Sequence, residues 1–147
     1  MYPIMLDITG KPVVIVGGGR IALRKAKALV KEGALVTVVS PELDGGFSEL
    51  PVAWKQKAYE AGDLHGAFLV FACTDNMEVN RSVRRDASSR QLVNVTSEKE
   101  LSDFHNMAVV EGEEYMLAVS TRGSDPSRAK GLRRELKAWM EERSRHL

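Results

Sequence analysis

A glycine-rich turn between a buried strand and a helix most constrains the fold of this 147-residue chain. Residues 11–16 (KPVVIV) are mostly apolar and β-branched, which is typical of a strand covered on both faces of a parallel sheet. Three glycines at 17–19 end this strand, and residues 20–32 then carry apolar side chains at the spacing of one helix face. Gly33 is a natural helix stop before a second buried strand at 35–39 (LVTVV). The sequence therefore predicts an initial β-α-β unit.

The middle of the chain continues this alternation. Strands are expected at residues 52–55, 67–73 and 92–95, with a turn at 61–66 that contains a short helical segment. A helix is expected at 76–90, where apolar residues repeat every four positions between arginines. This order predicts an α/β fold with a doubly wound, mainly parallel sheet of the Rossmann type.

The last third is less regular. Residues 107–110 and 115–120 are expected to form a hairpin that extends the sheet. A final helix is expected from Pro126 to Leu147, with Asp125 or Ser124 at its start. If its apolar side chains are exposed, they favour a partner surface and hence a homodimer. These side chains are Leu132, Leu136, Trp139 and Met140.

Charge and hydropathy exclude several classes of function. With 21 Lys and Arg against 20 Asp and Glu, the chain has no global electrostatic basis for binding nucleic acid or a membrane. Its longest apolar run, residues 67–73, is far shorter than the ~20 residues that span a bilayer. No secretory signal is visible, and the single cysteine, Cys73, is predicted to be a buried thiol. We predict a cytoplasmic protein.

The glycine turn is a candidate cofactor site. Residues 17–22 (GGGRIA) fit the pattern G-x-G-x-x-G/A, in which Gly17 permits a tight turn and Gly19 lets the backbone approach a pyrophosphate. Ala22 is small enough for close packing of the helix on the strand, and the amides at the helix start face the anion. Three glycines also make an ordinary sharp turn, but this turn lies between a strand and a helix in a β-α-β unit. The position therefore favours a dinucleotide.

Other strand ends suggest which dinucleotide is bound. Ser40, Pro41 and Glu42 follow the second strand, where NAD-binding proteins usually carry an acidic residue for the ribose. No Arg or Lys occupies positions 40–43 to meet a 2′-phosphate, so NAD is expected rather than NADP. Residues 74–76 (TDN) and Asn94 lie at the ends of later strands, on the same edge of the sheet. Residues 74–76 also suit a helix N-cap, and both roles are compatible.

Several segments together resemble the precorrin-2 dehydrogenases, which are the dehydrogenase domains of sirohaem synthases. The similarity runs from about Tyr2 to Leu136 and includes LDITGK, ACTDN, NVTSEKELSDF, AVSTRGSDPSRAKGLRREL and the whole of residues 13–42. It implies NAD-dependent oxidation of precorrin-2 to sirohydrochlorin, on the path to sirohaem or cobalamin, by a homodimer. It further implies an NAD-binding Rossmann domain at residues 1–104 and a dimerisation and substrate-cleft region, made of the hairpin and last helix, at 105–147.

The resemblance also assigns residues to the cofactor. It implies that Gly17, Gly18 and Gly19 contact the pyrophosphate, with the amides of Arg20 and Ile21 next to them. Pro41 and Glu42 are implied at the adenosine end, and Thr74 and Asp75 along the cofactor. No metal ligands are assigned.

The implied general base departs from the family pattern. Members often have an aspartate two residues after the NV of the strand, and this chain has Ser97 there. A neutral hydroxyl does not accept a proton near neutral pH without activation, which disfavours the iron insertion that some relatives perform. Dehydrogenation depends less on this carboxylate, because the hydride leaves to the nicotinamide. Asp103 and His105, together with Glu98, are the nearby substitutes.

The implied substrate carries eight carboxylates, so cationic side chains are expected around it. Arg122, Arg128 and Lys130 are candidates, although each also suits a solvated helix face. Thr121 and Ser124 belong to the same polar loop.

Two other functions remain open from the sequence. An NAD-sensing regulatory module of similar fold would bind NAD without oxidising anything. A degenerate family member would bind the tetrapyrrole without turnover, as the replacement of aspartate by Ser97 allows.

Overall fold

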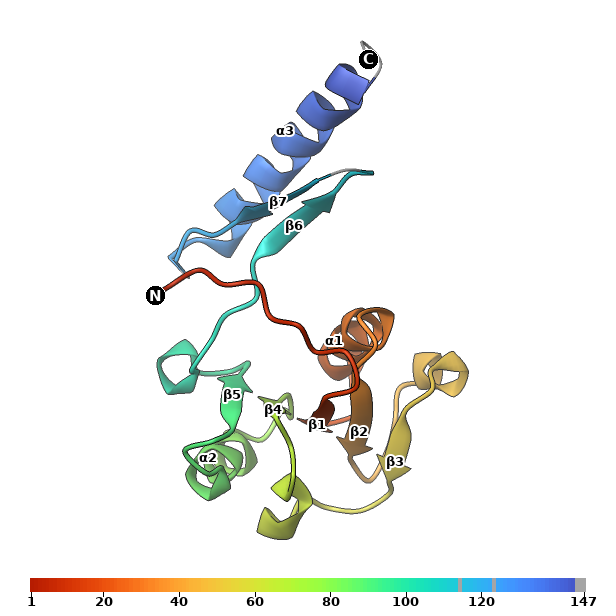
Figure 1. Cartoon of the computed structure of the whole chain (residues 1–147). Coiled ribbons are helices and arrows are strands. Elements are labelled where there is room, and N and C mark those ends of the chain that lie inside the picture. Colours follow the sequence, from red (N-terminus) through yellow and green to blue (C-terminus); the bar gives the residue numbers. More distant parts are fainter. Residues whose placement is uncertain (114, 123, 145–147) are drawn as a thin grey trace. The chain divides into compact units, whose positions relative to one another are not determined.

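The computed structural model describes residues 1–113, 115–122 and 124–144, and it divides into two compact units (Figure 1). The first unit is Tyr2–Phe104, and the second is His105–Leu147 together with Met1. We describe each unit by itself.

The first unit is built on a five-stranded parallel sheet in the order β3-β2-β1-β4-β5. The direction in which strands are added reverses between β1 and β4, which confirms the doubly wound fold. Val16 at the end of β1 lies opposite Val39 of β2 and Ala72 of β4, so these three strands end level. The strands are β1 (Pro12–Val16), β2 (Leu35–Val39), β3 (Ala53–Lys55), β4 (Leu69–Ala72) and β5 (Leu92–Val95).

Two helices cover opposite faces of this sheet because each has one apolar face. Helix α1 (Arg20–Lys31) buries Ala22, Ala26 and Leu29 in a cluster with Phe71 of β4. Helix α2 (Met77–Asp86) buries Val83 in a second cluster, with alternate residues of the same strands. Gly33 ends α1 with a left-handed φ of 77°, as predicted. Short 3-10 turns lie at Gly45–Glu49, Ala61–Leu64 and Lys99–Leu101.

Helix α2 is shorter than the predicted 76–90. It ends at Asp86, and Ala87 has an extended backbone. The side chain of Gln91 explains this departure, since it accepts a hydrogen bond from Ser88 N and donates to the carbonyls of Leu64 and Ala67. These three hydrogen bonds of the Gln91 side chain favour an extended backbone from Ala87 onwards over further turns of the helix.

The second unit contains an antiparallel pair of strands and a long helix. Strands β6 (Ala108–Glu111) and β7 (Met116–Val119) form their own two-stranded sheet, so the prediction that the hairpin extends the main sheet is wrong. Helix α3 (Pro126–Ser144) contacts both strands, and Asp125 caps it by accepting Arg128 N at 2.9 Å. The predicted end of this helix, residues 145–147, lies outside the described residues. No helix in the described ranges is long and apolar enough to cross a membrane.

The apolar side chains of α3 are less exposed than the sequence suggested. Met140 is buried at 5% exposure within the second unit, and Leu132 and Leu136 are half-buried. Trp139 remains 45% exposed. Met140 therefore does not belong to the exposed partner surface that was predicted for this helix.

The outer edge of β5 is occupied by side chains rather than by a further strand. Asp103 accepts a hydrogen bond from Val93 N, and Ser102 Oγ accepts one from Val95 N, each at 2.9 Å. Asp103 N also donates to Val93 O at 2.8 Å. Because these backbone groups already have partners, the hairpin has no ladder to join at β5.

A buried carboxylate after β3 makes the stability of the first unit dependent on pH. Asp63 is 6% exposed and accepts hydrogen bonds from Glu60 N, Lys55 Nζ and Lys57 Nζ. Burial opposes its ionisation, but the Glu60 N–H and the ammonium groups of Lys57 and Lys55 outweigh it and hold the pKa of Asp63 below its ordinary value. The ionised form therefore stabilises the fold above about pH 4, and this contribution is lost as the pH falls through the folded-state pKa.

We expect Asp63→Asn to lower the free energy of unfolding at pH 7 by about 1–3 kcal/mol, because it removes charged hydrogen bonds. Urea denaturation at pH 7 and near pH 2 measures this, and the difference from the native protein should shrink at the acidic pH. Glu60→Gln is the control: the Glu60 side chain is 77% exposed, its ion pair with Lys57 lies at the surface, and a glutamine oxygen can still accept the capping hydrogen bond from Asp63 N. A difference that persists unchanged in acid would contradict the assignment.

Candidate functional site

A pocket of about 790 Å³ lies at the level where β1, β2 and β4 end. This volume is within the ~300–1,000 Å³ typical of sites for small ligands. Three loops form its wall, and all of them belong to the first unit. The lining residues are Gly17, Gly18, Gly19, Arg20 and Ile21 after β1, Ser40, Pro41, Glu42, Leu43 and Asp44 after β2, and Cys73, Thr74 and Asp75 after β4.

The first two glycines of the turn let these loops approach closely. Gly17 has a φ of 117°, and a Cβ there would lie 2.7 Å from the carbonyl oxygen of Cys73. A Cβ on Gly18 would overlap the carbonyl oxygen of Glu42. Gly18 O also accepts a hydrogen bond from Asp44 N at 2.7 Å. The rim of the pocket is therefore backbone packed against backbone, with no room for side chains at these positions.

The third glycine faces open space. Gly19 is the N-cap of α1, and it has an extended backbone without a side-chain hydrogen bond to the helix start. A Cβ on Gly19 would meet no atom of the described residues within 4 Å. A cradle of this kind, beside the first amides of a helix, fits the pyrophosphate of a dinucleotide.

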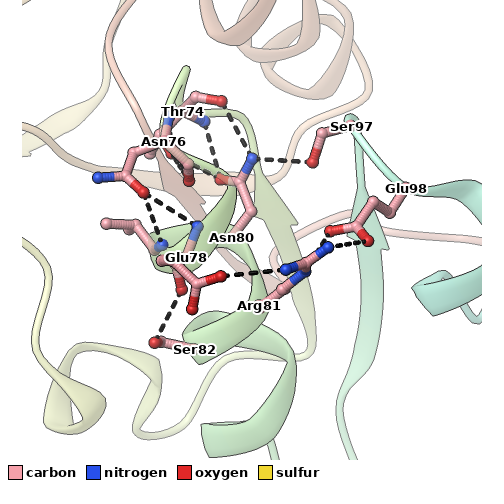
Figure 2. A network of polar contacts seen from close by, with 9 residues as sticks. Thr74, Asn76, Glu78, Asn80, Arg81, Ser82, Ser97 and Glu98 are labelled. Atoms are coloured by element: carbon pink, nitrogen blue, oxygen red, sulfur yellow. Dashed lines mark hydrogen bonds and ion pairs between the residues drawn. The ribbon is translucent and has the colours of Figure 1, made fainter.

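The loop after β4 both caps a helix and lines the pocket. Asn76 Oδ1 accepts hydrogen bonds from Glu78 N and Val79 N, so Asn76 is the N-cap of α2. Thr74 and Asp75 belong to the pocket wall. Figure 2 shows that the side chain of Asn80 lies between Thr74 and Ser97, to which it is joined by hydrogen bonds. Of residues 74–76, Asn76 is therefore the helix cap, whereas Thr74 and Asp75 line the pocket.

Asn94 and Cys73 are both buried, at 7% exposure each. Asn94 is not part of the pocket wall, because its amide donates to the carbonyl of Phe104 at 2.9 Å. Burial raises the pKa of the Cys73 thiol to about 11, which confirms the predicted buried thiol. Cys73 nevertheless reaches the wall of the pocket.

The three candidate catalytic residues lie in different surroundings. Ser97 is exposed, and its Oγ accepts a hydrogen bond from Asn80 Nδ2 at 3.1 Å. Asp103 is held at the edge of β5 by Val93 N and by an ion pair with Arg84. His105 is half-buried and is the first residue of the second unit, apart from Met1.

The candidate substrate residues lie in the second unit, in the loop before α3 and its first turns. Thr121 Oγ1 bonds both the N–H and the carbonyl of Asp125, and Ser124 Oγ donates to Thr121 O. These hydroxyls close the loop onto the helix start. Arg122, which has a left-handed φ of 54°, is exposed, as are Arg128 and Lys130.

Comparisons with known proteins agree with this geometry. The family model described as "Putative NAD(P)-binding" matches residues 4–108. The precorrin-2 dehydrogenase of Bacillus subtilis (strain 168) is 36% identical over 136 residues, which cover 90% of this chain and 84% of that protein. The chain belongs to the precorrin-2 dehydrogenase family. A solved structure titled "SirC, precorrin-2 dehydrogenase" superposes with a TM-score of 0.85 at 32% identity, over 94% of this chain and 70% of the other.

Other members of the precorrin-2 dehydrogenase family match as part of longer proteins. The siroheme synthase of Methylobacillus flagellatus is 41% identical over 136 residues, which cover 89% of this chain and 29% of that protein. The chain thus corresponds to less than a third of the siroheme synthase. These matches confirm the resemblance to this family that the sequence motifs indicated.

Four residues in or next to this site were not predicted from the sequence. Leu43, Asp44 and Cys73 line the pocket directly beside residues that were predicted. Their adjacency in sequence was the available signal. Asn80 gave no such signal, because its partners lie 6 and 17 residues away in sequence.

Proposed function

We propose that this chain oxidises precorrin-2 to sirohydrochlorin with NAD as the hydride acceptor. The observation that carries the proposal is the glycine-rimmed pocket at the carboxyl ends of β1, β2 and β4, in a chain matched over 84% of the length of a precorrin-2 dehydrogenase. Bound NAD would supply the redox chemistry by accepting the hydride. The glycine turn and the first amides of α1 would hold its pyrophosphate, with Pro41 and Glu42 at the adenosine end.

The charge of the pocket wall supports NAD over NADP. Arg20 is the one cationic residue among the described lining residues, whereas Glu42, Asp44 and Asp75 are acidic. The loop after β2, where a 2′-phosphate would lie, contributes two of these three carboxylates. A further phosphate would meet like charge there, which costs binding free energy.

The residues around Ser97 are proposed to handle the substrate. We assign Ser97 a hydrogen bond to the tetrapyrrole, because Asn80 holds its hydroxyl beside the cofactor loop. We propose Asp103 only as a secondary proton acceptor, since its carboxylate already accepts a hydrogen bond from Val93 N at the edge of the sheet. We assign the proton released during oxidation to an imidazole nitrogen of His105. The cations Arg122, Arg128 and Lys130 would bind the substrate carboxylates, with Thr121 and Ser124 shaping their loop.

We also propose that the protein is a cytoplasmic homodimer that pairs through the second unit. The exposed Trp139 of α3 supports this, since a large apolar side chain at the surface favours a partner.

Anaerobic turnover tests the proposed function. Purified protein is incubated with enzymatically made precorrin-2 and either NAD or NADP, and the formation of NADH and of the sirohydrochlorin spectrum is followed. We expect turnover by the native protein with NAD, and a kcat/KM with NADP that is lower by about tenfold or more because of the acidic wall. Ser97→Asp is assayed in parallel and should retain the dehydrogenase activity.

Two outcomes would contradict this function. Binding of precorrin-2 without NADH formation, with activity restored only by Ser97→Asp, would show a degenerate tetrapyrrole-binding member. Binding of NADH without any binding of precorrin-2 would show a cofactor-sensing module.

A further inference from the structure

The side chain of Asn80 joins the ends of two neighbouring strands. Asn80 projects from α2, is fully buried, and directs its amide away from its own helix (Figure 2). Its Oδ1 accepts hydrogen bonds from Thr74 Oγ1 at 2.7 Å and Thr74 N at 3.1 Å. Its Nδ2 donates to Thr74 O at 3.0 Å and to Ser97 Oγ at 3.1 Å. Both amide protons and both acceptor sites of this side chain are therefore used.

Three of these four bonds fix one residue of the cofactor pocket. Thr74 follows β4, and a single side chain binds both its N–H and its carbonyl, as a neighbouring strand would. Thr74 Oγ1 in turn accepts a hydrogen bond from Asn76 N, and its single proton is shared between Asn80 Oδ1 and the Asn76 carbonyl oxygen. The turn that carries Asp75 into the pocket wall is thus held at both ends.

The fourth bond reaches the loop after β5. Ser97 stands where the family resemblance implies the general base. Thr96, next to it, donates through both N and Oγ1 to Ala72 O, which keeps this loop beside the end of β4. The same buried amide therefore holds the pocket wall and residue 97 in one geometry.

We propose that Asn80 is a positioning residue that fixes the Thr74–Asp75 wall of the nicotinamide half of the pocket and couples it to residue 97. The naming of the nicotinamide rests on the proposed function: with the pyrophosphate at the turn after β1 and the adenosine beside the loop after β2, the nicotinamide falls on the other side of β1, beside the loop after β4. Burying an amide is favourable only when every partner is in place, so the Asn80 side chain holds these two loops in one arrangement, which an apolar side chain such as that of Val83 could not do.

The neighbouring residue provides a matched control. Arg81 also joins α2 to the loop after β5, through Nε to Glu98 Oε1 at 2.9 Å, but its side chain is 42% exposed. It forms ion pairs with Glu98 and Glu78, and neither of these residues lines the pocket. Arg81→Gln therefore weakens the same connection between elements without releasing Thr74.

The test compares Asn80→Leu, Asn80→Asp and Arg81→Gln in the full chain with two measurements. Hydrogen exchange of the Thr74 amide is followed in the ligand-free protein, and affinities are measured for NADH and for ADP-ribose, which lacks the nicotinamide. We expect Asn80→Leu to accelerate Thr74 exchange and to weaken NADH binding about tenfold, as loss of these hydrogen bonds allows, with ADP-ribose changed less than about twofold. Asn80→Asp keeps the acceptor for Thr74 N but replaces the donor to Thr74 O by an oxygen, so NADH binding should weaken here too.

A double-mutant cycle measures the coupling to residue 97. Ser97→Ala should slightly weaken NADH binding in the native background and have no further effect in Asn80→Leu, because leucine offers the Ser97 hydroxyl no hydrogen-bond partner.

Several outcomes would overturn the inference. These are an equal loss of NADH and ADP-ribose affinity, the same changes in Arg81→Gln, or unchanged Thr74 exchange in Asn80→Leu. If Asn80→Leu does not fold, Asn80→Asp carries the same comparison. If the native protein binds neither ligand, the proposed function fails, and Thr74 exchange in the ligand-free variants decides the inference alone.

Discussion

Gly18→Ala is expected to abolish measurable NADH binding and to destabilise the first unit. The added methyl group would overlap the Glu42 carbonyl oxygen and lie 2.8 Å from both Leu43 Cδ2 and Ser40 Oγ. Because the overlapped atom is backbone, the loop after β2 must move away from the glycine turn, and the hydrogen bond from Asp44 N to Gly18 O is strained with it. We expect a loss of about 1–3 kcal/mol in unfolding free energy, as for other overpacked sites.

Gly19→Ala is the matched control for this experiment. Its methyl group would meet no described atom within 4 Å, and Gly19 has a φ of −83°, which alanine adopts readily. Alanine is a poorer N-cap than glycine, so the thermal midpoint should fall slightly, but less than in Gly18→Ala. NADH binding should still weaken, because the methyl group stands where the pyrophosphate approaches the turn.

Fluorescence titration with NADH and thermal unfolding of both variants measure these effects. Native NADH affinity in Gly19→Ala would mean that the phosphates do not approach this turn. Native stability in Gly18→Ala would mean that the loop after β2 yields without cost.

Phe71→Ala should produce the largest loss of stability, about 3–5 kcal/mol of unfolding free energy. Phe71 lies on β4, between β1 and β5, and is 1% exposed. Its ring meets that of Phe104 edge-on, with centroids 5.4 Å apart, and the ammonium of Lys25 lies 4.8 Å from its centre. The substitution leaves a cavity and removes the aromatic partner of both neighbours.

Phe68 provides the comparison, since it also has a lysine over its ring but is only half-buried. Phe68→Ala should cost clearly less than Phe71→Ala in urea denaturation at pH 7. The reverse order would show that the burial of the ring does not set the cost of removing it.

The first half of the fold could be predicted because its signals are local. Residues 11–39 contain an apolar strand, a glycine turn, an amphipathic helix and a glycine stop, and each local pattern agrees with the parallel sheet. The pocket wall near the turn was predicted for the same reason, since the residues that line it directly follow the strands.

The failures came from interactions between segments distant in sequence. Helix α2 ends early because Gln91 binds the carbonyls of Leu64 and Ala67, some 25 residues away. The two strand-like segments at residues 107–110 and 115–120 predicted a hairpin correctly, but such a local pattern does not specify which sheet a hairpin joins. Asn80 was placed correctly in a helix, yet its bonds to Thr74 and Ser97 depend on how the sheet brings two strand ends together.

The side chains along the outer edge of β5 also affect the tendency of this protein to aggregate at high concentration. A strand with unpaired N–H and carbonyl groups is a template on which another molecule can add a strand, and this is a common route to aggregation. Ser102 and Asp103 already bind the groups of Val93 and Val95 that such a strand would need. Removing both side chains would free the N–H groups of Val93 and Val95 for such a strand, so two short polar residues protect this edge from aggregation.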